Sequence, residues 1–317
     1  MISKEGKHVL NSQIKDKIDN MPEVPGIYKM LDAKGVIIYI GKSKCLKKRV
    51  KSYFVASPKW EKARKMAPFI HDIEYIETDT HLEALLLECQ LIKEVQPLFN
   101  VQMKNDGRYV YVKIADHHCS IVHERDENCF GPFRSKYVLQ NMLDRLKSIY
   151  PIDEQLEYHV LPVSMTKAEA EQNFKKVHEM FRNTNQMESL AKQLEQKMQE
   201  ASAEYRFGLA AKYRDIAEAV RYFKTGIDRY HGLLKKNMLL KIKLDAGYKF
   251  FFVSKGQVVY KKRVAHLTDR HQRLFLAEAR QQKQPLNMNE KSLIDYRDII
   301  LSEIDQLPEE SVIITED

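Results

Sequence analysis

Long apolar runs and patterned cysteines are absent from this chain of 317 residues. No stretch of about 18 apolar residues occurs, so we expect no membrane-spanning helix. The first residues, MISKEGKHVLNSQIKDK, lack the apolar core of an export signal. The few cysteines form no CxxC pair, which is typical of a reducing compartment; they are Cys45, Cys89, Cys119 and Cys129. These absences predict a cytoplasmic protein that does not bind a membrane.

Acidic residues are nearly missing from one segment. Between Lys34 and Lys65 the chain has eleven lysines and arginines but only one acid, Glu61. The whole chain carries a net charge of +8, so the excess of positive charge is local. A basic segment with interleaved aromatic residues indicates contact with a nucleic-acid backbone. A solvated, lysine-rich helix is the alternative explanation.

The same part of the chain predicts a β-hairpin followed by a helix. Gly26–Leu31 and Val36–Ile40 are expected strands, joined by a turn at Asp32–Gly35 in which glycine takes a positive φ. Gly41 is expected to turn the chain out of the second strand. A helix with exposed lysines is predicted over Leu46–Phe54.

Further elements follow from periodicity and from capping residues. A short helix over residues 8–20 precedes the hairpin, and a strand is expected over Ile73–Thr78. Thr80 and Glu83 predict a capping box at the start of a helix that Pro97 ends. The later expected elements are strands over Tyr109–Ile114 and Ser120–His123, a turn at Phe130–Phe133 and a helix over Ser135–Ile149.

The composition changes near Pro151. Residues 166–182 and 187–228 are rich in Glu, Lys, Gln and Ala, which predicts a helical hairpin with its corner near Phe207-Gly208. From Met238 onward three strands are expected, with a turn at Lys255-Gly256, then two helices and a last strand over Ser311–Thr315. The predicted fold class is α+β: a small antiparallel sheet flanked by helices, a helical hairpin, and a small α/β C-terminal region.

One motif carries a family resemblance. Gly26-Ile27-Tyr28 and Tyr39-Ile40-Gly41 are separated by ten residues, and this pattern resembles the GIY-YIG nucleases. The following residues stand in the register of that family: Lys42, Arg49, Tyr53, Glu88 and Asn100. Over residues 21–150, including Cys129–Phe133, the chain is similar to the N-terminal half of UvrC, the incision subunit of bacterial nucleotide excision repair.

The resemblance implies a metal-dependent DNA endonuclease. Hydrolysis of a phosphodiester needs an activated water and groups that stabilise the added negative charge. Tyr28 is implied as the base, with Tyr39 orienting the water. A tyrosine has a pKa near 10, and we expect Lys42 and a metal ion to lower the pKa of Tyr28.

The remaining implied roles concern phosphate and metal. Arg49 offers a planar fork to the scissile phosphate, and Tyr53 and Asn100 position the phosphate or hold the site together. Glu88 would bind one Mg²⁺ or Mn²⁺ together with waters and phosphate oxygens. Glu83 is a rival carboxylate whose capping position already explains it. Lysines of the basic segment are predicted to bind double-stranded DNA: Lys44, Lys47, Lys48 and Lys51.

If the later motif residues did not follow at the spacing of the family, packing between neighbouring strands would be enough to explain Tyr28 and Tyr39.

A second resemblance lies in the predicted helical hairpin. The stretch AEYRFGLAAKYRDIAEAV is similar to the UVR motif, through which UvrC contacts UvrB. The matching residues predicted to bind this partner are Phe207, Ala211, Arg214 and Asp215. Gly208 stands where the motif has glutamate. The alternative is a hairpin that packs within the chain on the nuclease domain.

Four domains are expected: a nuclease domain over residues 1–105, a UvrC-like linker region with strands and one helix over 106–165, the UVR-like hairpin over 166–230, and a C-terminal α/β region over 231–317. The last resembles a truncated RNase H-like domain, so we expect a single active site. UvrC relatives carry a cysteine cluster where this chain has IDEQLEYHVLPVSM, so no iron–sulfur cluster is expected.

The leading hypothesis is an endonuclease that nicks one strand on the 3′ side of a lesion, recruited by UvrB. Short UvrC-like proteins of the Cho type are the nearest in architecture. Two alternatives stay open: a structure-specific nuclease of a mobile element that acts without UvrB, and a non-catalytic DNA-binding adaptor.

Overall fold

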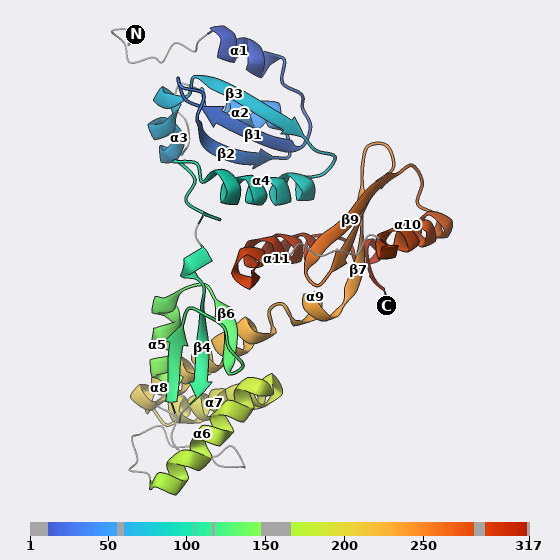
Figure 1. Ribbon diagram of the computed structural model, residues 1–317. Coiled ribbons are helices and arrows are strands. Elements are labelled where there is room, and N and C mark those ends of the chain that lie inside the picture. Colours follow the sequence, from blue (N-terminus) through green and yellow to red (C-terminus); the bar gives the residue numbers. More distant parts are fainter. Residues whose placement is uncertain are drawn as a thin grey trace. The chain divides into compact units, whose positions relative to one another are not determined.

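A computed structural model describes residues 12–55, 60–104, 106–115, 118–146, 166–281 and 289–315. The chain forms two compact units (Figure 1). The first combines Met1–Asn105 with Leu233–Asp317, and the second is Asp106–Gly232. In the described part of the chain no helix combines the length and the apolar composition that a membrane crossing requires.

The first unit begins with a three-stranded antiparallel sheet in the order β2-β1-β3. Its strands are β1 (Gly26–Leu31), β2 (Ile37–Ser43) and β3 (Asp72–Glu77). The predicted hairpin is confirmed: Gly35 has a φ of 76°, and Oδ1 of Asp32 accepts the backbone N–H groups of Lys34 and Val36. The second strand runs on through Gly41, however, so the predicted exit at this glycine is wrong.

Four helices flank this sheet: α1 (Ser12–Asp19), α2 (Leu46–Lys51), α3 (Glu61–Met66) and α4 (His81–Val95). The predicted helix start at Thr80 is confirmed, because its hydroxyl accepts the Glu83 N–H while the Glu83 carboxylate accepts the Asp79 N–H. Helix α4 packs on β1 and β2. Helix α3 is six residues long and was not predicted.

The rest of the first unit is a four-stranded antiparallel sheet in the order β10-β7-β8-β9. Its strands are β7 (Asn237–Lys243), β8 (Tyr248–Ser254), β9 (Gln257–Val264) and β10 (Val312–Thr315). Its helices are α9 (His231–Lys235), α10 (Asp269–Gln281) and α11 (Glu290–Ile304). The predicted turn is confirmed, with φ of 50° at Lys255 and 73° at Gly256.

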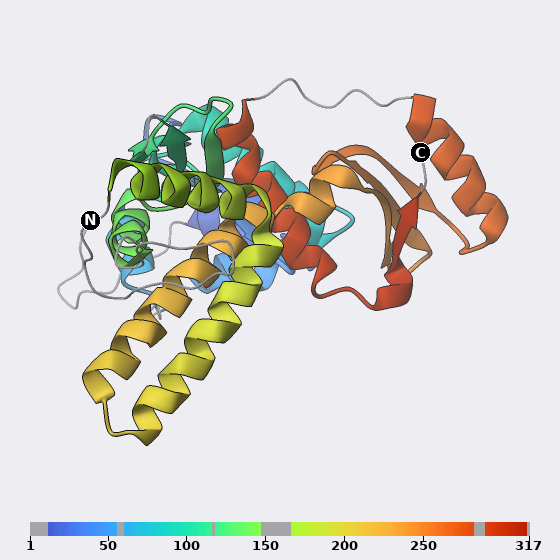
Figure 2. The same ribbon diagram turned by 90° about the horizontal axis from the view of Figure 1, so that it is seen from below.

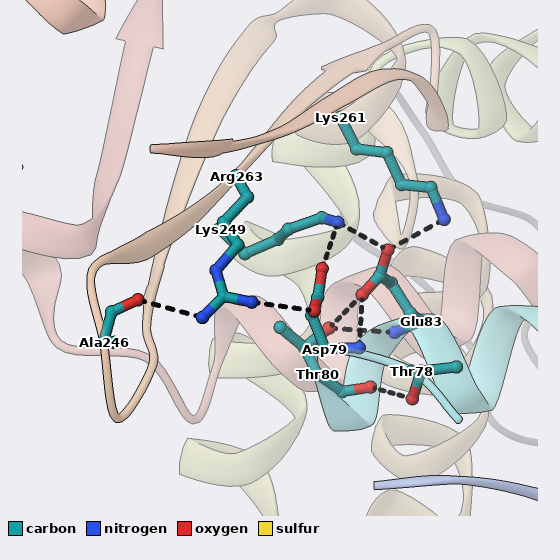
Figure 3. Close-up of polar contacts among 8 residues, drawn as sticks. All are labelled: Thr78, Asp79, Thr80, Glu83, Ala246, Lys249, Lys261 and Arg263. Atoms are coloured by element: carbon teal, nitrogen blue, oxygen red, sulfur yellow. Dashed lines mark hydrogen bonds and ion pairs between the residues drawn. The ribbon is translucent and has the colours of Figure 1, made fainter. Parts of the chain in front are cut away.

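This C-terminal region packs on helix α4 of the nuclease sheet. Leu82 and Cys89 of α4 share one buried cluster with Leu240, Phe251 and Ile300. Charged residues at the start of α4 meet lysines and an arginine of the C-terminal sheet (Figure 3). One side of α4 therefore faces β1 and β2, and another faces the C-terminal region.

The second unit joins a small sheet to a group of helices. The sheet has the order β5-β4-β6, with β4 (Val110–Ala115), β5 (His118–Val122) and β6 (Cys129–Phe133). The helices are α5 (Lys136–Leu146), α6 (Lys167–Arg182), α7 (Thr184–Ala203) and α8 (Phe207–Asp228). Short 3₁₀ turns span Asp106–Arg108 here, and Ala67–Phe69 and Glu309–Ser311 in the first unit.

The turn at Phe130–Phe133 and the helical hairpin were both predicted for this unit. The predicted turn at Phe130–Phe133 is wrong: these residues lie in β6, an edge strand. An edge position tolerates Pro132, which has no N–H to donate. The helical hairpin is confirmed as α7 and α8 (Figure 2), but its corner lies between Ala203 and Phe207, just before the predicted place. The segment expected to lack an iron–sulfur cluster lies outside the described residues.

Candidate active site

Three tyrosines gather on the nuclease sheet. Tyr28 lies in β1, Tyr39 in β2 and Tyr53 just after α2. Their ring centroids are 5.8 to 6.2 Å apart, and the hydroxyls of Tyr28 and Tyr53 are 2.8 Å apart. Tyr28 is fully buried and Tyr53 nearly so. The structure thus forms one hydroxyl cluster from residues that the sequence separates.

Two glycines of this sheet stand where a Cβ would clash, and Gly41 is the one beside the tyrosine cluster. Gly41 pairs with Tyr28 across β1 and β2, and a Cβ on Gly41 would lie 2.3 Å from the Tyr28 hydroxyl. A Cβ on Gly26 would lie 2.3 Å from the backbone oxygen of Ile76. Gly41 is therefore needed for the close approach of the Tyr28 ring and not for a turn.

Arg49 is the cation next to Tyr28. Its Nε donates to the Tyr28 hydroxyl at 3.4 Å, and its Cζ lies 5.4 Å from the centroid of the Tyr53 ring. Burial raises the pKa of Tyr28 well above its ordinary value, the neighbouring Tyr53 and Tyr39 raise it further, and Arg49 opposes them. Lys42 instead contacts His81 through its Nζ, and the expected effect of Lys42 together with a metal ion on the pKa of Tyr28 stays a prediction.

Glu88 projects from α4 toward β2. Its Oε1 accepts the backbone N–H of Lys42 at 3.1 Å. Burial raises the pKa of Glu88 to about 7, although the charges of Lys42, Arg49 and Lys62 act to lower it. Burial also raises the pKa of Tyr39, and Tyr53 and then the Glu88 charge contribute to this rise.

The donor set around Glu88 fits a hydrated divalent cation. Within the described residues no group of three or more His, Cys, Asp or Glu side chains could hold a metal ion. A single carboxylate suits Mg²⁺, which keeps several waters and is completed by substrate phosphates.

Lys42 reaches His81, a residue that was not predicted. The Lys42 Nζ donates to the His81 Nε2 at 3.0 Å. Burial, and then the charges of Lys42 and Lys44, lower the pKa of His81 to about 4, so the imidazole is neutral and accepts this bond. His81 lies seven residues before Glu88, two helical turns away on the same face of α4. That spacing could have indicated it.

Asn100 holds the strand beside the tyrosines. Its Oδ1 accepts the N–H of Ile40 and its Nδ2 donates to the carbonyl of the same residue, both at 2.9 Å. The side chain is buried. Of the two predicted roles for Asn100, these contacts fit holding the site together rather than touching phosphate.

The four predicted DNA-binding lysines differ in their surroundings. Lys47 donates to the carbonyl of Asp19 at 2.7 Å, and Lys48 pairs with Glu23 at 3.3 Å. Lys51 is exposed. Lys44 is exposed too, and its charge contributes to the lowered pKa of His81.

Two residues at the start of α3 complete the surroundings. The Arg49 Cζ lies 4.1 Å from the centroid of the Trp60 ring, and the Lys62 Nζ lies 4.6 Å from that of Tyr39. Neither residue was predicted. The only tryptophan of the chain, placed inside the basic segment, was the available signal.

Comparisons with known proteins match two segments of the chain. Residues 24–101 match the family model of the UvrC-like GIY-YIG domain, and residues 188–222 match that of the UvrB/uvrC motif. All seven predicted catalytic and metal-binding residues lie inside the first match, and the second covers the facing parts of α7 and α8.

Relatives and solved structures extend these matches. UvrABC system protein C of Acetivibrio thermocellus is 31% identical over 78% of this chain and 44% of its own length. That of Caldanaerobacter subterraneus is 35% identical over 65% and 38%. The chain thus spans less than half of these relatives. The magnesium-bound GIY-YIG N-terminal endonuclease domain of UvrC from Thermotoga maritima is 39% identical and fully covered, over 29% of this chain, with a TM-score of 0.27.

Proposed function

We propose that this chain, a UvrC-like GIY-YIG protein with a UVR motif, is a metal-dependent endonuclease that nicks one strand of double-stranded DNA. The observation that carries the proposal is a pair of groups built on strands β1 and β2 of the nuclease sheet. One is the Tyr28 hydroxyl with Arg49 and Tyr53, and the other is Glu88 on the N–H of Lys42.

The side chains can divide the reaction among them. A water oxygen attacks phosphorus, a P–O ester bond breaks, and the proton of the water passes to Tyr28 acting as base. Tyr28 must first give its own proton to solvent, and Arg49 is the neighbouring cation that favours the phenolate. The leaving oxygen takes a proton from solvent. The N–H groups of Arg49 also fit the phosphate oxygens. A divalent cation on Glu88 would supply Lewis-acid stabilisation of the phosphate and the leaving oxygen.

The test is nicking of a lesion-bearing duplex in Mg²⁺ or Mn²⁺, with and without UvrB. Glu88→Ala is expected to bind DNA and not to cut it. Glu94→Ala is the matched control, because it removes an exposed carboxylate from the same helix. Cutting by Glu88→Ala at the native rate would contradict the proposed metal site.

The UVR-like hairpin supports UvrB as the partner. Near the hairpin corner Tyr205 is 81% exposed and Phe207 63% exposed, with their ring centroids 6.1 Å apart. Further along α8, Arg214 and Asp215 form an exposed pair at 2.8 Å. The C-terminal part of α8 is buried within the chain, since Val220 and Phe223 lie in the core of the second unit.

Binding to immobilised UvrB tests this partner. Phe207→Ala and Arg214→Ala are expected to weaken capture. Lys175→Ala is the control, because Lys175 is an exposed lysine of α6 outside the matched segment 188–222. With UvrB, the site would make the 3′-side incision of nucleotide excision repair. Nicking that needs no UvrB would instead favour a structure-specific nuclease of a mobile element. No cutting of duplex, flap or branched DNA would favour the adaptor.

We also propose a four-domain division of the chain, contact of DNA with the lysines of the basic segment, and a cytoplasmic location. The second has a direct test. Replacing Lys44 and Lys51 by Met should weaken DNA binding and reduce its salt dependence, because each phosphate contact releases a counterion.

A further inference from the structure

We propose that Trp60 is a positioning residue for Arg49, one that holds the guanidinium in place for the scissile phosphate. The proposal rests on the proposed nuclease function. Trp60 directly precedes α3, and its ring lies 4.1 Å from the Arg49 Cζ. The Tyr53 ring lies 5.4 Å from the same carbon, and the centroids of the two rings are 6.2 Å apart. The guanidinium therefore has two aromatic neighbours.

An aromatic clamp suits a phosphate-binding arginine. Stacking engages the flat face of the guanidinium, whereas hydrogen bonds use the N–H groups at its edge. A carboxylate partner would occupy those N–H groups and compete with the phosphate. Trp60 can restrict the long Arg49 side chain and still leave N–H groups for the substrate, while Nε keeps its contact with Tyr28.

A competing role for Trp60 is stacking on a DNA base. The ring is 41% exposed, and single aromatic side chains do stack on bases of nucleic acids. The two roles differ in what they change. Positioning of Arg49 acts on the rate of the chemical step, whereas base stacking acts on the affinity for DNA.

Nicking by three variants of the full chain separates these roles. With saturating DNA and Mg²⁺, Trp60→Leu is expected to lower the single-turnover rate about 3- to 30-fold, the range of a cation–π contact. Trp60→Phe keeps an aromatic face and should recover most of that loss. Tyr137→Leu is the control, because Tyr137 is an aromatic residue of α5 that is 82% exposed and lies outside the basic segment.

The affinity for DNA, measured by fluorescence anisotropy in Ca²⁺, is expected to change less than about twofold in Trp60→Leu. A weaker affinity together with a native rate at saturating DNA would overturn the positioning role and assign base stacking to Trp60. A native rate together with a native affinity would overturn the role as well.

A second readout does not depend on cutting. Trp60 is the only tryptophan in the chain, so the tryptophan emission of the free protein reports on this ring alone. Arg49→Ala should shift the emission and make it more accessible to acrylamide, and Lys65→Met, at an exposed residue of α3, should not. Unchanged emission and quenching in Arg49→Ala would overturn the proposal. If the native chain cuts no DNA, the proposed function fails, and the emission alone decides whether the clamp exists.

Discussion

Replacing Lys249 by methionine should weaken the attachment of the C-terminal region to α4. The Lys249 Nζ lies 2.6 Å from Oδ2 of Asp79 and 3.1 Å from Oε1 of Glu83 (Figure 3). Lys249 and Glu83 are both more than nine-tenths buried. Methionine keeps most of the side-chain volume and removes the charge, so the variant tests the ion pairs rather than the packing.

The expected loss of stability depends on the charged groups that remain in the variant. Removing one partner of a buried pair costs about 3 to 5 kcal/mol, because the other charge is left uncompensated. Here the loss should be smaller, since Lys261 still lies 2.8 Å from Glu83 and Asp79 is 34% exposed with Arg263 at 3.7 Å. We expect a free energy of unfolding lower by about 2 kcal/mol and a Tm lower by about 4 to 8 °C.

Urea and thermal unfolding, followed by circular dichroism, measure this loss. The matched control is Lys262→Met on the neighbouring strand β9: its pair with Glu278 is at 2.7 Å but nearly half exposed on both sides. Water screens such an exposed pair, so its loss should change the free energy of unfolding little. Equal losses in the two variants would refute the argument that burial makes the Lys249 pairs matter.

The stability that Lys249 contributes should change with pH in a definite direction. The hydrogen bond from Lys249 lowers the pKa of Asp79, with smaller contributions from Arg263 and Lys261. A carboxyl with a depressed folded pKa contributes stability above its unfolded pKa, near 4, and loses it as the pH falls through the folded value. The stability difference between native chain and Lys249→Met should therefore be full at pH 6 and shrink below about pH 4. A difference that grows on acidification would contradict this assignment.

Three predictions concern the tyrosine cluster. Gly41→Ala should cost about 1 to 3 kcal/mol of stability and most of the nicking activity, because the added Cβ would meet the Tyr28 ring; native unfolding and native nicking would contradict this. Asn100→Ala should cost about 2 kcal/mol, as it leaves the N–H and carbonyl of Ile40 without these partners; urea unfolding checks it. Tyr53→Phe should cost about 1 kcal/mol of stability and lower the single-turnover rate by at least about tenfold, because the Tyr28 hydroxyl loses its partner at 2.8 Å. A rate within twofold of native would exclude a role of Tyr53 in positioning Tyr28.

Local patterns in the sequence were enough for several elements. The hairpin around Gly35, the cap at Thr80 and the paired helices α7 and α8 depend on residues close together in the chain. Where a local pattern is compatible with two structures, the prediction from the sequence was the wrong structure. A glycine after a strand suggested an exit at Gly41, and the Gly131-Pro132 step suggested a turn, but both positions lie within strands.

The sequence by itself determined the hairpin, the capped helix and the spacing of the tyrosines, arginine and glutamate, since these follow from short-range geometry and from the order of residues. Only the tertiary structure decided that Arg49, and not Lys42, contacts Tyr28, that Trp60 covers Arg49, and that the C-terminal sheet pairs with the start of α4. The reason is physical: contacts between side chains remote in sequence depend on how strands and helices pack, and no local pattern records that packing.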